Sequence, residues 1–181
     1  MASLPAKFRV RAPWVAVPLV AWFASPTPLL LGVGAVIAVA GLLIRGWAAG
    51  TIHKDTRLTT TGPYAFTRNP LYLGSFLIGV GVGIATGRLW LFAGFVVFFA
   101  WLYRRTIRQE AAHLEKLYGD EFRRYAASVP AFRPRLTPHQ AAEQESGPFS
   151  LDRYLQHREW EAALGVAAGL AFLAAKLLWM R

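Results

Sequence analysis

Two polar segments carry the residues whose types and spacing suit them to binding chemistry, and the first covers residues 61–74. Its Gly-Pro pair marks a turn, and Pro70 suits the first turn of a helix. The free N–H groups at such a helix start can bind an anion or a polar ligand. Tyr64, Phe66 and Tyr72 could hold a flat ring or a cationic sulfonium. An aromatic belt at a membrane interface would give the same pattern, so this segment alone favours neither interpretation.

The second segment contains Glu110, a carboxylate that stands among Arg104, Arg105 and Arg108 beside the apolar face of an amphipathic stretch. One interpretation is a solvated helix surface with ion pairs. The other is a carboxylate that hydrogen-bonds a cofactor against a protein wall. His113 follows Glu110 by three residues, and a Glu-x-x-His pair can bind metal when other helices of a bundle repeat it. No second copy occurs in this sequence, so we expect no metal site.

Several other patterns favour structural roles. The chain has no cysteine, which excludes disulfides, thiolate nucleophiles and cysteine-ligated metal or iron–sulfur sites. His139 and His157 fall in a polar stretch and are expected to be solvated. Glycines four residues apart inside apolar runs favour close helix packing over nucleotide binding, because the spacing of a phosphate-binding loop is missing. These pairs are Gly46/Gly50, Gly79/Gly83, Gly83/Gly87 and Gly165/Gly169.

Long apolar runs must position these residues. Apolar residues make up 55% of the 181 residues and charged residues only 17%, whereas a soluble domain averages about 25% charged. A membrane span needs about 20 residues. The run 29–49 is long enough to span, and the run 12–24 is short. The apolar runs are 12–24, 29–49, 71–85, 89–103 and 160–179.

A short turn separates residues 71–85 from residues 89–103, which predicts an antiparallel helical hairpin. Each arm of 15 residues would measure about 22 Å, less than the roughly 30 Å of hydrocarbon. We therefore expect its polar ends to be sheltered by protein or to line a cavity. In residues 104–127 the apolar positions recur at helical spacing. Gly119 is expected to end one helix there, and Asp120 can cap a second.

The net charge of +10 does not indicate nucleic-acid binding, because basic residues flank the apolar runs instead of forming one face. With the N-terminus inside, 17 basic residues fall on the inner side and 3 on the outer side. Such asymmetry places both polar segments and the N-terminus in the cytoplasm, and the protein in an inner, cytoplasmic membrane. The basic N-terminus and its apolar run could imitate a signal peptide, but Ser25-Pro26-Thr27-Pro28 is a poor cleavage site, which favours a retained helix.

The predicted fold is therefore an all-α, polytopic membrane bundle of about five hydrophobic helices with a cytoplasmic amphipathic helix. Five spans would put the C-terminus outside. The chain divides into an N-terminal helix pair, a core of turn, hairpin and amphipathic helix, a polar linker and a C-terminal membrane helix. The boundaries are 1–50, 51–135, 136–158 and 159–181.

The motif GPYAFTRNPLYLG, followed by a hairpin and then RQEAAHLEKLYGDEFRRYAASVPAFRP, resembles the cofactor half of the isoprenylcysteine carboxyl methyltransferase family. That superfamily also includes membrane phospholipid N-methyltransferases. The resemblance covers about residues 45–134. It implies S-adenosylmethionine as cofactor, bound without a Rossmann domain in a pocket that the amphipathic helix closes. The cofactor-binding residues that it implies are Thr56, Arg57, Leu58, Thr59, Tyr64, Asn69, Pro70, Leu71, Tyr72 and Glu110.

Two positions depart from the family pattern. Asn69 stands where the family usually has histidine, and Ala111 stands where a second glutamate is common. The substrate-side arginine of the family aligns near Thr106, with Arg105 and Arg108 close by in the sequence.

The resemblance implies methyl transfer to a lipophilic small molecule that reaches the site from the membrane lipid. Methyl transfer is an in-line displacement and needs no metal. A carboxylate acceptor would need a positive clamp, for which Arg105 or Arg108 are candidates. An amine acceptor would have to lose a proton, which His113 or Glu110 could take.

Two alternatives stay open. An NADPH-dependent membrane reductase of the sterol-reductase type shares a similar turn and the closing Tyr…Val-Pro segment, although the Gly-Pro-Tyr turn favours the methyltransferase. A non-catalytic membrane protein that keeps the shell of an enzyme is the other alternative, and Asn69 and Ala111 are its support.

Overall fold

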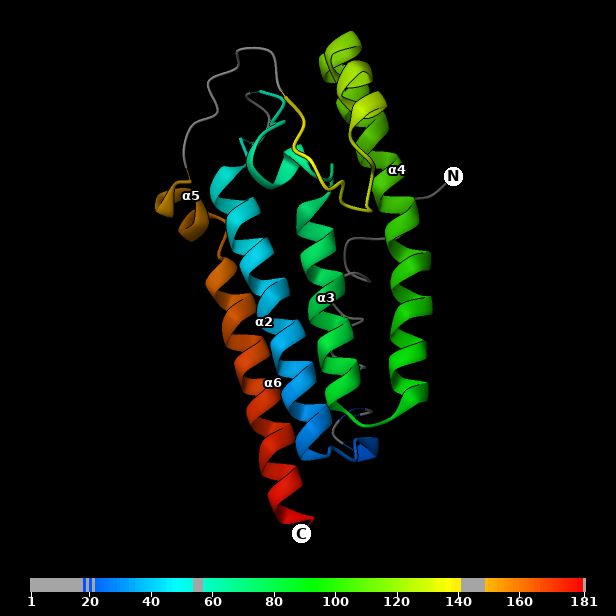
Figure 1. Ribbon diagram of the computed structural model, residues 1–181, viewed down its shortest axis with the longest axis vertical. Helices are drawn as coiled ribbons and strands as arrows, with labels where there is room; N and C mark the ends of the chain where they lie inside the picture. The colour runs from blue at the N-terminus through cyan, green and yellow to red at the C-terminus, as the bar shows by residue number, and fades with distance from the viewer. Residues whose placement is uncertain (1–17, 19, 21, 54–56, 141–148, 181) are drawn as a thin grey trace.

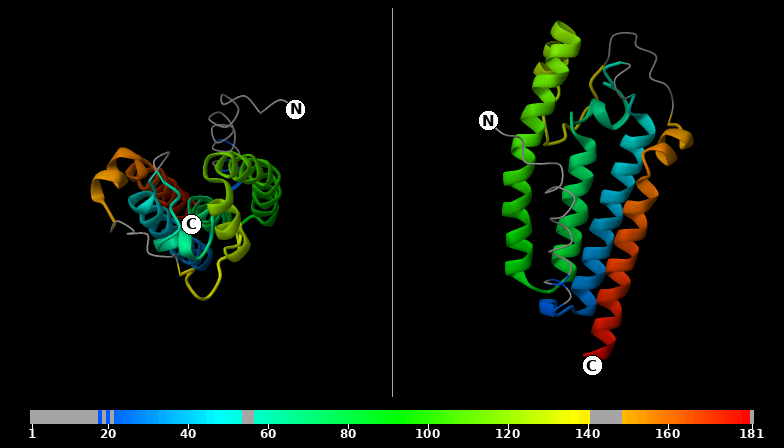
Figure 2. Two further views of the ribbon diagram at one scale, coloured as in Figure 1. Left: turned by 90° about the horizontal axis from the view of Figure 1, so that it is seen from above. Right: turned by 180° about the vertical axis from the view of Figure 1, so that it is seen from behind.

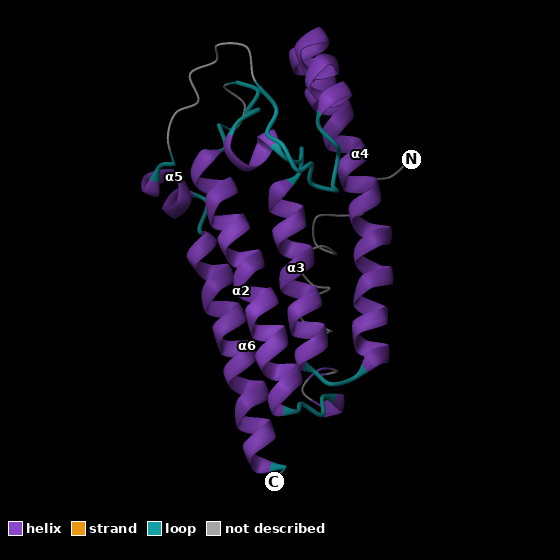
Figure 3. Ribbon diagram, viewed as in Figure 1, coloured by secondary structure: helices purple, strands orange, loops and turns teal. Residues whose placement is uncertain are grey.

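The computed structural model describes residues 18, 20, 22–53, 57–140 and 149–180. This part of the chain contains five α-helices and one short 3-10 helix and has no strand (Figures 1 and 3). The predicted all-α bundle is confirmed. Most of the apolar run 12–24 lies outside the described residues.

Four long helices form a curved row in the order α4, α3, α2, α6 (Figures 1 and 2). Their bounds are Leu89–Ser128 for α4, Pro70–Ala85 for α3, Pro28–Thr51 for α2 and Glu159–Trp179 for α6. Among the described residues, α2, α4 and α6 are long and apolar enough to cross a membrane, and α3 is a shorter apolar helix. Large apolar side chains such as Val36, Leu43 and Leu164 are exposed on the outer faces. Lipid is the solvent that suits such faces, so the chain is an integral membrane protein.

Glycines allow α2 and α3 to approach almost to backbone contact. A Cβ added at Gly34 would lie 2.3 Å from the carbonyl oxygen of Gly81, and one at Gly41 would lie 2.6 Å from that of Gly74. Such small residues are how helices pack closely in membranes. The predicted packing role also holds for Gly79, which faces the ring of Phe95.

The same prediction is wrong for Gly165 and Gly169. An added Cβ would meet nothing within 4 Å at either position, so the described part of the chain leaves open space beside this pair.

Helix α4 differs from the prediction in its continuity. We expected separate helices at residues 89–103 and 104–127, but one helix runs through both and extends past the start of α3 (Figure 1). The basic residues after Tyr103 do not interrupt it, since arginine is a good helix former. Gly119 does break it, as predicted, with a φ of 52°. The chain then folds back, and Phe122 and Tyr125 pack on Leu114 and Leu58.

The polar linker is also more structured than expected. Residues Leu151–Gln156 form a short helix, α5, beside the end of α2. Arg153 Nε donates to the Gly50 carbonyl oxygen at 2.8 Å, and the Phe149 ring occupies the space where Gly50 has no side chain. This anchoring brings the start of α6 against the last turns of α2 and the start of α3.

Candidate functional site

The Gly-Pro-Tyr turn forms the 3-10 helix η1, Gly62–Ala65, in which Gly62 has a φ of 58°. The last turns of α4 and the chain that follows them hold this turn in place. Tyr125 donates through its hydroxyl to the Tyr64 carbonyl oxygen at 2.7 Å, and Arg68 N donates to Pro130 O at 2.9 Å. Asn69 Nδ2 donates to the Ala131 carbonyl oxygen at 2.7 Å. The turn is therefore fixed before any ligand binds.

A cavity of about 560 Å³ lies where this turn meets five helices, within the usual range of roughly 300–1,000 Å³ for ligand pockets. Its walls come from the last turns of α2, from η1, from the start of α3, from α4 and from the α5–α6 junction. The lining residues are Arg45, Ile52, Tyr64, Arg68, Asn69, Pro70, Leu71, Tyr72, Glu110, Gln156, His157 and Glu159.

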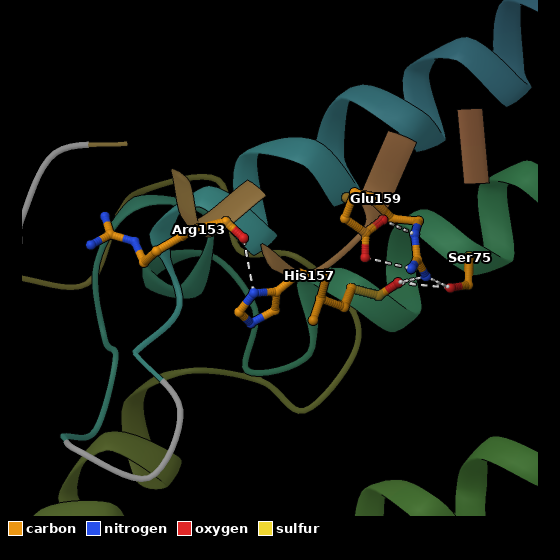
Figure 4. A network of polar contacts seen from close by, with 6 residues as sticks. Ser75, Arg153, His157 and Glu159 are labelled. Atoms are coloured by element: carbon orange, nitrogen blue, oxygen red, sulfur yellow. Dashed lines mark hydrogen bonds and ion pairs between the residues drawn. The ribbon is translucent and has the colours of Figure 1, made fainter. Parts of the chain in front are cut away.

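An ion pair joins α2 to α6 at one wall of the cavity (Figure 4). Arg45 Nη2 donates to Glu159 Oε1 at 2.7 Å, and Arg45 Nε donates to Glu159 Oε2 at 2.8 Å. The remaining Nη1 group of Arg45 contacts the hydroxyl of Ser75 and the carbonyl oxygen of Leu71. Glu159 is buried. Both charges are thus paired, as charged groups in membrane helices require.

Three polar atoms of the cavity wall are buried without a hydrogen-bond partner: Tyr64 Oη, Arg68 Nε and His157 Nε2. Orphaned buried groups are costly, and a ligand is one way to satisfy them. Burial raises the pKa of the Tyr64 hydroxyl, so this group stays protonated and can donate. Burial lowers the pKa of Arg68, but a guanidinium keeps its charge at neutral pH. The cavity therefore offers two donors that suit an anionic group.

Glu110 reaches the cavity from α4. Its Oε2 accepts a hydrogen bond from the Tyr72 hydroxyl at 2.8 Å. Tyr72 packs edge-on against Tyr103 of α4, with ring centroids 4.8 Å apart. A carboxylate beside two aromatic rings suits a cationic group. The side chain of Glu110 is exposed, so this wall is open to solvent.

The structure brings six of the ten predicted cofactor-binding residues to the cavity: Tyr64, Asn69, Pro70, Leu71, Tyr72 and Glu110. Their binding role stays a prediction.

Thr56 lies outside the described residues, and the other three predicted positions do not line the cavity. Leu58 is buried with Phe122 and Tyr125, Thr59 Oγ1 accepts from His53 N at 3.0 Å, and Arg57 contacts the His53 ring. These residues belong to a packed loop, and their side chains contact other residues of the protein.

The predicted catalytic residues Arg105, Arg108 and His113 also lie outside the cavity lining. All three are exposed on α4, and the Arg105 guanidinium stacks over the Trp101 ring at 5.4 Å. The reason is helical phase: at about 100° per residue, Arg105 and Arg108 lie on a different side of α4 from Glu110. The charged residues and the histidine that line the cavity besides Glu110 are instead Arg45, Arg68, His157 and Glu159.

The sequence analysis did not select these four residues for the site. Arg45 carried a signal, because an arginine inside an apolar run needs a partner. Arg68 stands within the turn motif itself. His157 and Glu159 carried none, since they are 112 and 114 residues from Arg45, at the boundary between the predicted linker and the predicted C-terminal helix. The expectation that His157 is solvated is wrong, because the ring is half-buried in the cavity wall.

The cavity fits S-adenosylmethionine in three respects. Its volume suits a ligand of that size. Tyr64 Oη and Arg68 Nε are unpartnered donors that suit a carboxylate, and Glu110 with Tyr72 suits an ammonium or a sulfonium.

Comparisons with known proteins agree with the resemblance seen in the sequence. The model of the family described as phospholipid methyltransferase matches residues 22–121, more than half of the chain. The chain is 30% identical over 84 residues to a protein-S-isoprenylcysteine O-methyltransferase of Schizosaccharomyces pombe, which covers 46% of this chain and 36% of that protein.

Two further relatives have names that refer to metal resistance. The chain is 41% identical over 110 residues to the nickel-cobalt-cadmium resistance protein NccN of Alcaligenes xylosoxydans xylosoxydans, covering 60% of this chain. It is 37% identical over 113 residues to the cobalt-zinc-cadmium resistance protein CzcN of Cupriavidus metallidurans, covering 61% of this chain. The matched part spans about half the length of these two relatives, 51% and 52%.

No solved structure matches the chain. The family match covers α2, α3 and most of α4, the helices that carry the turn and Glu110. The fold, the cavity and the match together place this chain in the phospholipid methyltransferase family of membrane proteins.

Proposed function

We propose that the protein transfers a methyl group from S-adenosylmethionine to a lipophilic acceptor. The observation that supports this most strongly is the cavity at the Gly-Pro-Tyr turn, whose buried wall holds unpartnered donors beside an aromatic and carboxylate wall. It forms within the segment that the family model matches, apart from its α5–α6 wall.

In this proposal different residues of the chain bind different groups of the cofactor. Tyr64 and Arg68 donate to its carboxylate. Glu110 accepts from its ammonium while remaining bonded to Tyr72. The cofactor supplies an electrophilic methyl group, and the protein supplies position, since methyl transfer depends on holding the two reacting atoms about 3–3.5 Å apart and in line.

We also propose that the cavity opens to the cytoplasm from an inner membrane, on the basis of the 17-to-3 division of basic residues. The chain lacks cysteine, so single cysteines can report the topology. Asp120, whose side chain is 85% exposed near the cavity end, and Leu89, which is 80% exposed at the opposite end, are suitable positions. An impermeant thiol reagent applied to intact cells should label Leu89→Cys and spare Asp120→Cys. The reverse pattern would reject this orientation.

Among the described residues, no group of three or more His, Cys, Asp or Glu side chains is placed to hold a metal ion. Glu159 is paired with Arg45, and Glu110 accepts from Tyr72. We therefore do not extend the metal resistance in the names of two relatives to metal binding by this cavity.

Calorimetry on the protein purified in detergent tests the proposal. We expect S-adenosylhomocysteine to bind in the micromolar range and NADPH to give no heat. Binding of NADPH without binding of S-adenosylhomocysteine would overturn the proposal in favour of a reductase. Binding of neither would favour a protein that keeps only the shell of an enzyme.

A further inference from the structure

The α5–α6 junction, residues 156–159, forms a wall of the cavity that lies outside the family match of residues 22–121. Its backbone has an uncommon conformation, because Arg158 has a φ of 54°, a left-handed value that non-glycine residues seldom adopt. This turn ends α5 and starts α6. It directs both His157 and Glu159 to the cavity, although they are only two residues apart.

The hydrogen bonding of His157 fixes its tautomer. Nδ1 lies 2.9 Å from the Arg153 carbonyl oxygen (Figure 4). A carbonyl oxygen only accepts, so Nδ1 carries the proton of the neutral ring. Nε2 then has a free lone pair, and this atom is buried without a partner in the cavity wall. A ring held by one nitrogen with the other nitrogen uncommitted is the arrangement of a positioned proton acceptor.

Other groups at the cavity are less suited to accept a proton. Glu159 accepts two hydrogen bonds from Arg45. Glu110 accepts from Tyr72 and is open to solvent. Carboxylates are ordinarily weak bases near neutral pH, whereas imidazole is the side chain whose ordinary pKa lies closest to it, as general-base catalysis requires.

The charged groups of this wall also limit which chemical class of methyl acceptor can bind beside it. The guanidinium of Arg45 is engaged on all three nitrogens by Glu159, Ser75 and Leu71. The wall therefore presents an unprotonated nitrogen and no free cation to an incoming acceptor. A carboxylate acceptor, which needs a positive clamp and has no proton to lose, suits it poorly.

We propose that His157 is the general base of the methyl transfer, and that the acceptor is an amine or a hydroxyl, whose nucleophilic atom carries a proton. This rests on the proposed function. The acceptor atom forms a bond to the methyl carbon, and the carbon–sulfur bond breaks with its electron pair left on sulfur, which gives S-adenosylhomocysteine. The proton of the acceptor moves to His157 Nε2, and the imidazolium later releases it to water.

Two substitutions distinguish proton acceptance by His157 from a purely structural role of this side chain. His157→Asn keeps an N–H donor near the position of Nδ1, so the bond to Arg153 can persist, but it removes the basic nitrogen. His157→Gln places an amide near the position of Nε2, which can hydrogen-bond but cannot take a proton. His139→Asn is the matched control, because His139 contacts Ser128 outside the cavity lining.

The first test uses the full chain in nanodiscs with methyl-labelled S-adenosylmethionine and three probes: phosphatidylethanolamine, hexadecanol and palmitic acid. We expect the parent to methylate the amine or the alcohol. Both His157 variants should lose at least about 100-fold in this rate while S-adenosylhomocysteine affinity, measured by calorimetry, stays within about twofold. His139→Asn should match the parent. Methylation of palmitic acid alone, or a His157→Asn rate within threefold of the parent, would overturn the proposal.

The second test does not depend on turnover. In protein labelled with ¹⁵N-histidine, the resonances of His157 are identified as those lost in His157→Asn. We expect an Nδ1–H tautomer with unprotonated Nε2 at neutral pH in the S-adenosylhomocysteine complex. An Nε2–H tautomer would overturn the role of His157 even if the complex forms. Absence of S-adenosylhomocysteine binding by the parent would instead reject the proposed function.

Discussion

The two sides of the cavity are held by different kinds of contact. The turn side is held by main-chain hydrogen bonds: Arg68 N to Pro130 O, Arg135 N to Phe66 O and His139 N to Ala65 O, each 2.9 Å long. The α5–α6 side is joined to the bundle next to the cavity by the side-chain pair Arg45–Glu159, and farther along, Ser150 N and Arg153 Nε both donate to the Gly50 carbonyl oxygen.

This difference bears on function. Main-chain hydrogen bonds fix a site with little dependence on the neighbouring side chains, and a preorganised site suits a ligand of invariant shape such as a cofactor. The contact of the α5–α6 wall beside the cavity depends on two side chains, Arg45 and Glu159, so this wall can change with a few substitutions. We infer that the turn side serves the cofactor and the α5–α6 side serves the acceptor.

Breaking the ion pair should have the largest effect. Arg45→Met leaves Glu159, whose side chain is only 9% exposed, without a partner. Loss of one partner of a buried pair costs about 3–5 kcal/mol, so the variant should unfold well below the parent in a thermal denaturation in detergent. Arg45→Met combined with Glu159→Met should recover most of this stability, because an apolar pair of similar size is tolerated in place of a buried ion pair.

The double variant also tests whether the turn side binds the cofactor independently of the α5–α6 side. If the turn side is independent, its S-adenosylhomocysteine affinity should stay within about threefold of the parent. A double variant no more stable than Arg45→Met would show that the unpaired charge of Glu159 is not the cause of the lost stability. A large loss of cofactor affinity in a well-folded double variant would contradict the division into two walls.

Glu110→Gln tests the turn side of the comparison. Glutamine keeps the shape and the helix propensity, and can still accept from Tyr72. Loss of a charged hydrogen bond to the cofactor costs about 1.5–3 kcal/mol. We expect the lower end, because Glu110 is exposed, and therefore roughly a tenfold loss of S-adenosylhomocysteine affinity by calorimetry.

The control for this variant is Glu115→Gln. Glu115 pairs with Arg123 at 3.0 Å on the exposed face of α4, and exposed ion pairs contribute about 0–1 kcal/mol to stability. Its cofactor affinity should equal that of the parent. If Glu110→Gln also binds within twofold of the parent, Glu110 is not a cofactor ligand.

The same difference explains which parts could be predicted from the sequence. The helix start at Pro70 and the break at Gly119 are local: both follow from backbone conformation within a few residues. The positions of the apolar helices follow from hydrophobic periodicity, although the boundary predicted within α4 between residues 103 and 104 does not exist. The pairing of Arg45 with Glu159 joins residues 114 apart, and tertiary packing decides such contacts.

The difference between the predicted clamp on α4 and the cavity lining has a similar origin. Sequence spacing shows that Arg105, Arg108 and Glu110 share a helix, but the side of that helix that meets α3 is fixed by the packing of Tyr103 on Tyr72. The predicted clamp rests on proximity in sequence. Whether a residue of α4 reaches the cavity depends instead on its angular position around the helix axis.

The smallest expected effect concerns those residues and decides between the sequence hypothesis and the structure. Arg108 is exposed on α4 and does not line the cavity. Exposed substitutions away from special features change stability by at most about 0.5 kcal/mol, and a change of that size in binding is roughly twofold. Arg105→Gln, Arg108→Gln and His113→Gln should each stay within that range in S-adenosylhomocysteine affinity and in methyl transfer. Arg68→Gln is the contrast, because Arg68 Nε is buried in the cavity wall without a partner, and it should lose at least about tenfold in cofactor affinity. A variant of Arg108 that keeps cofactor affinity but loses methyl transfer would support the predicted clamp. The acceptor would then bind along the outer side of α4, and the α5–α6 wall would not be the acceptor side.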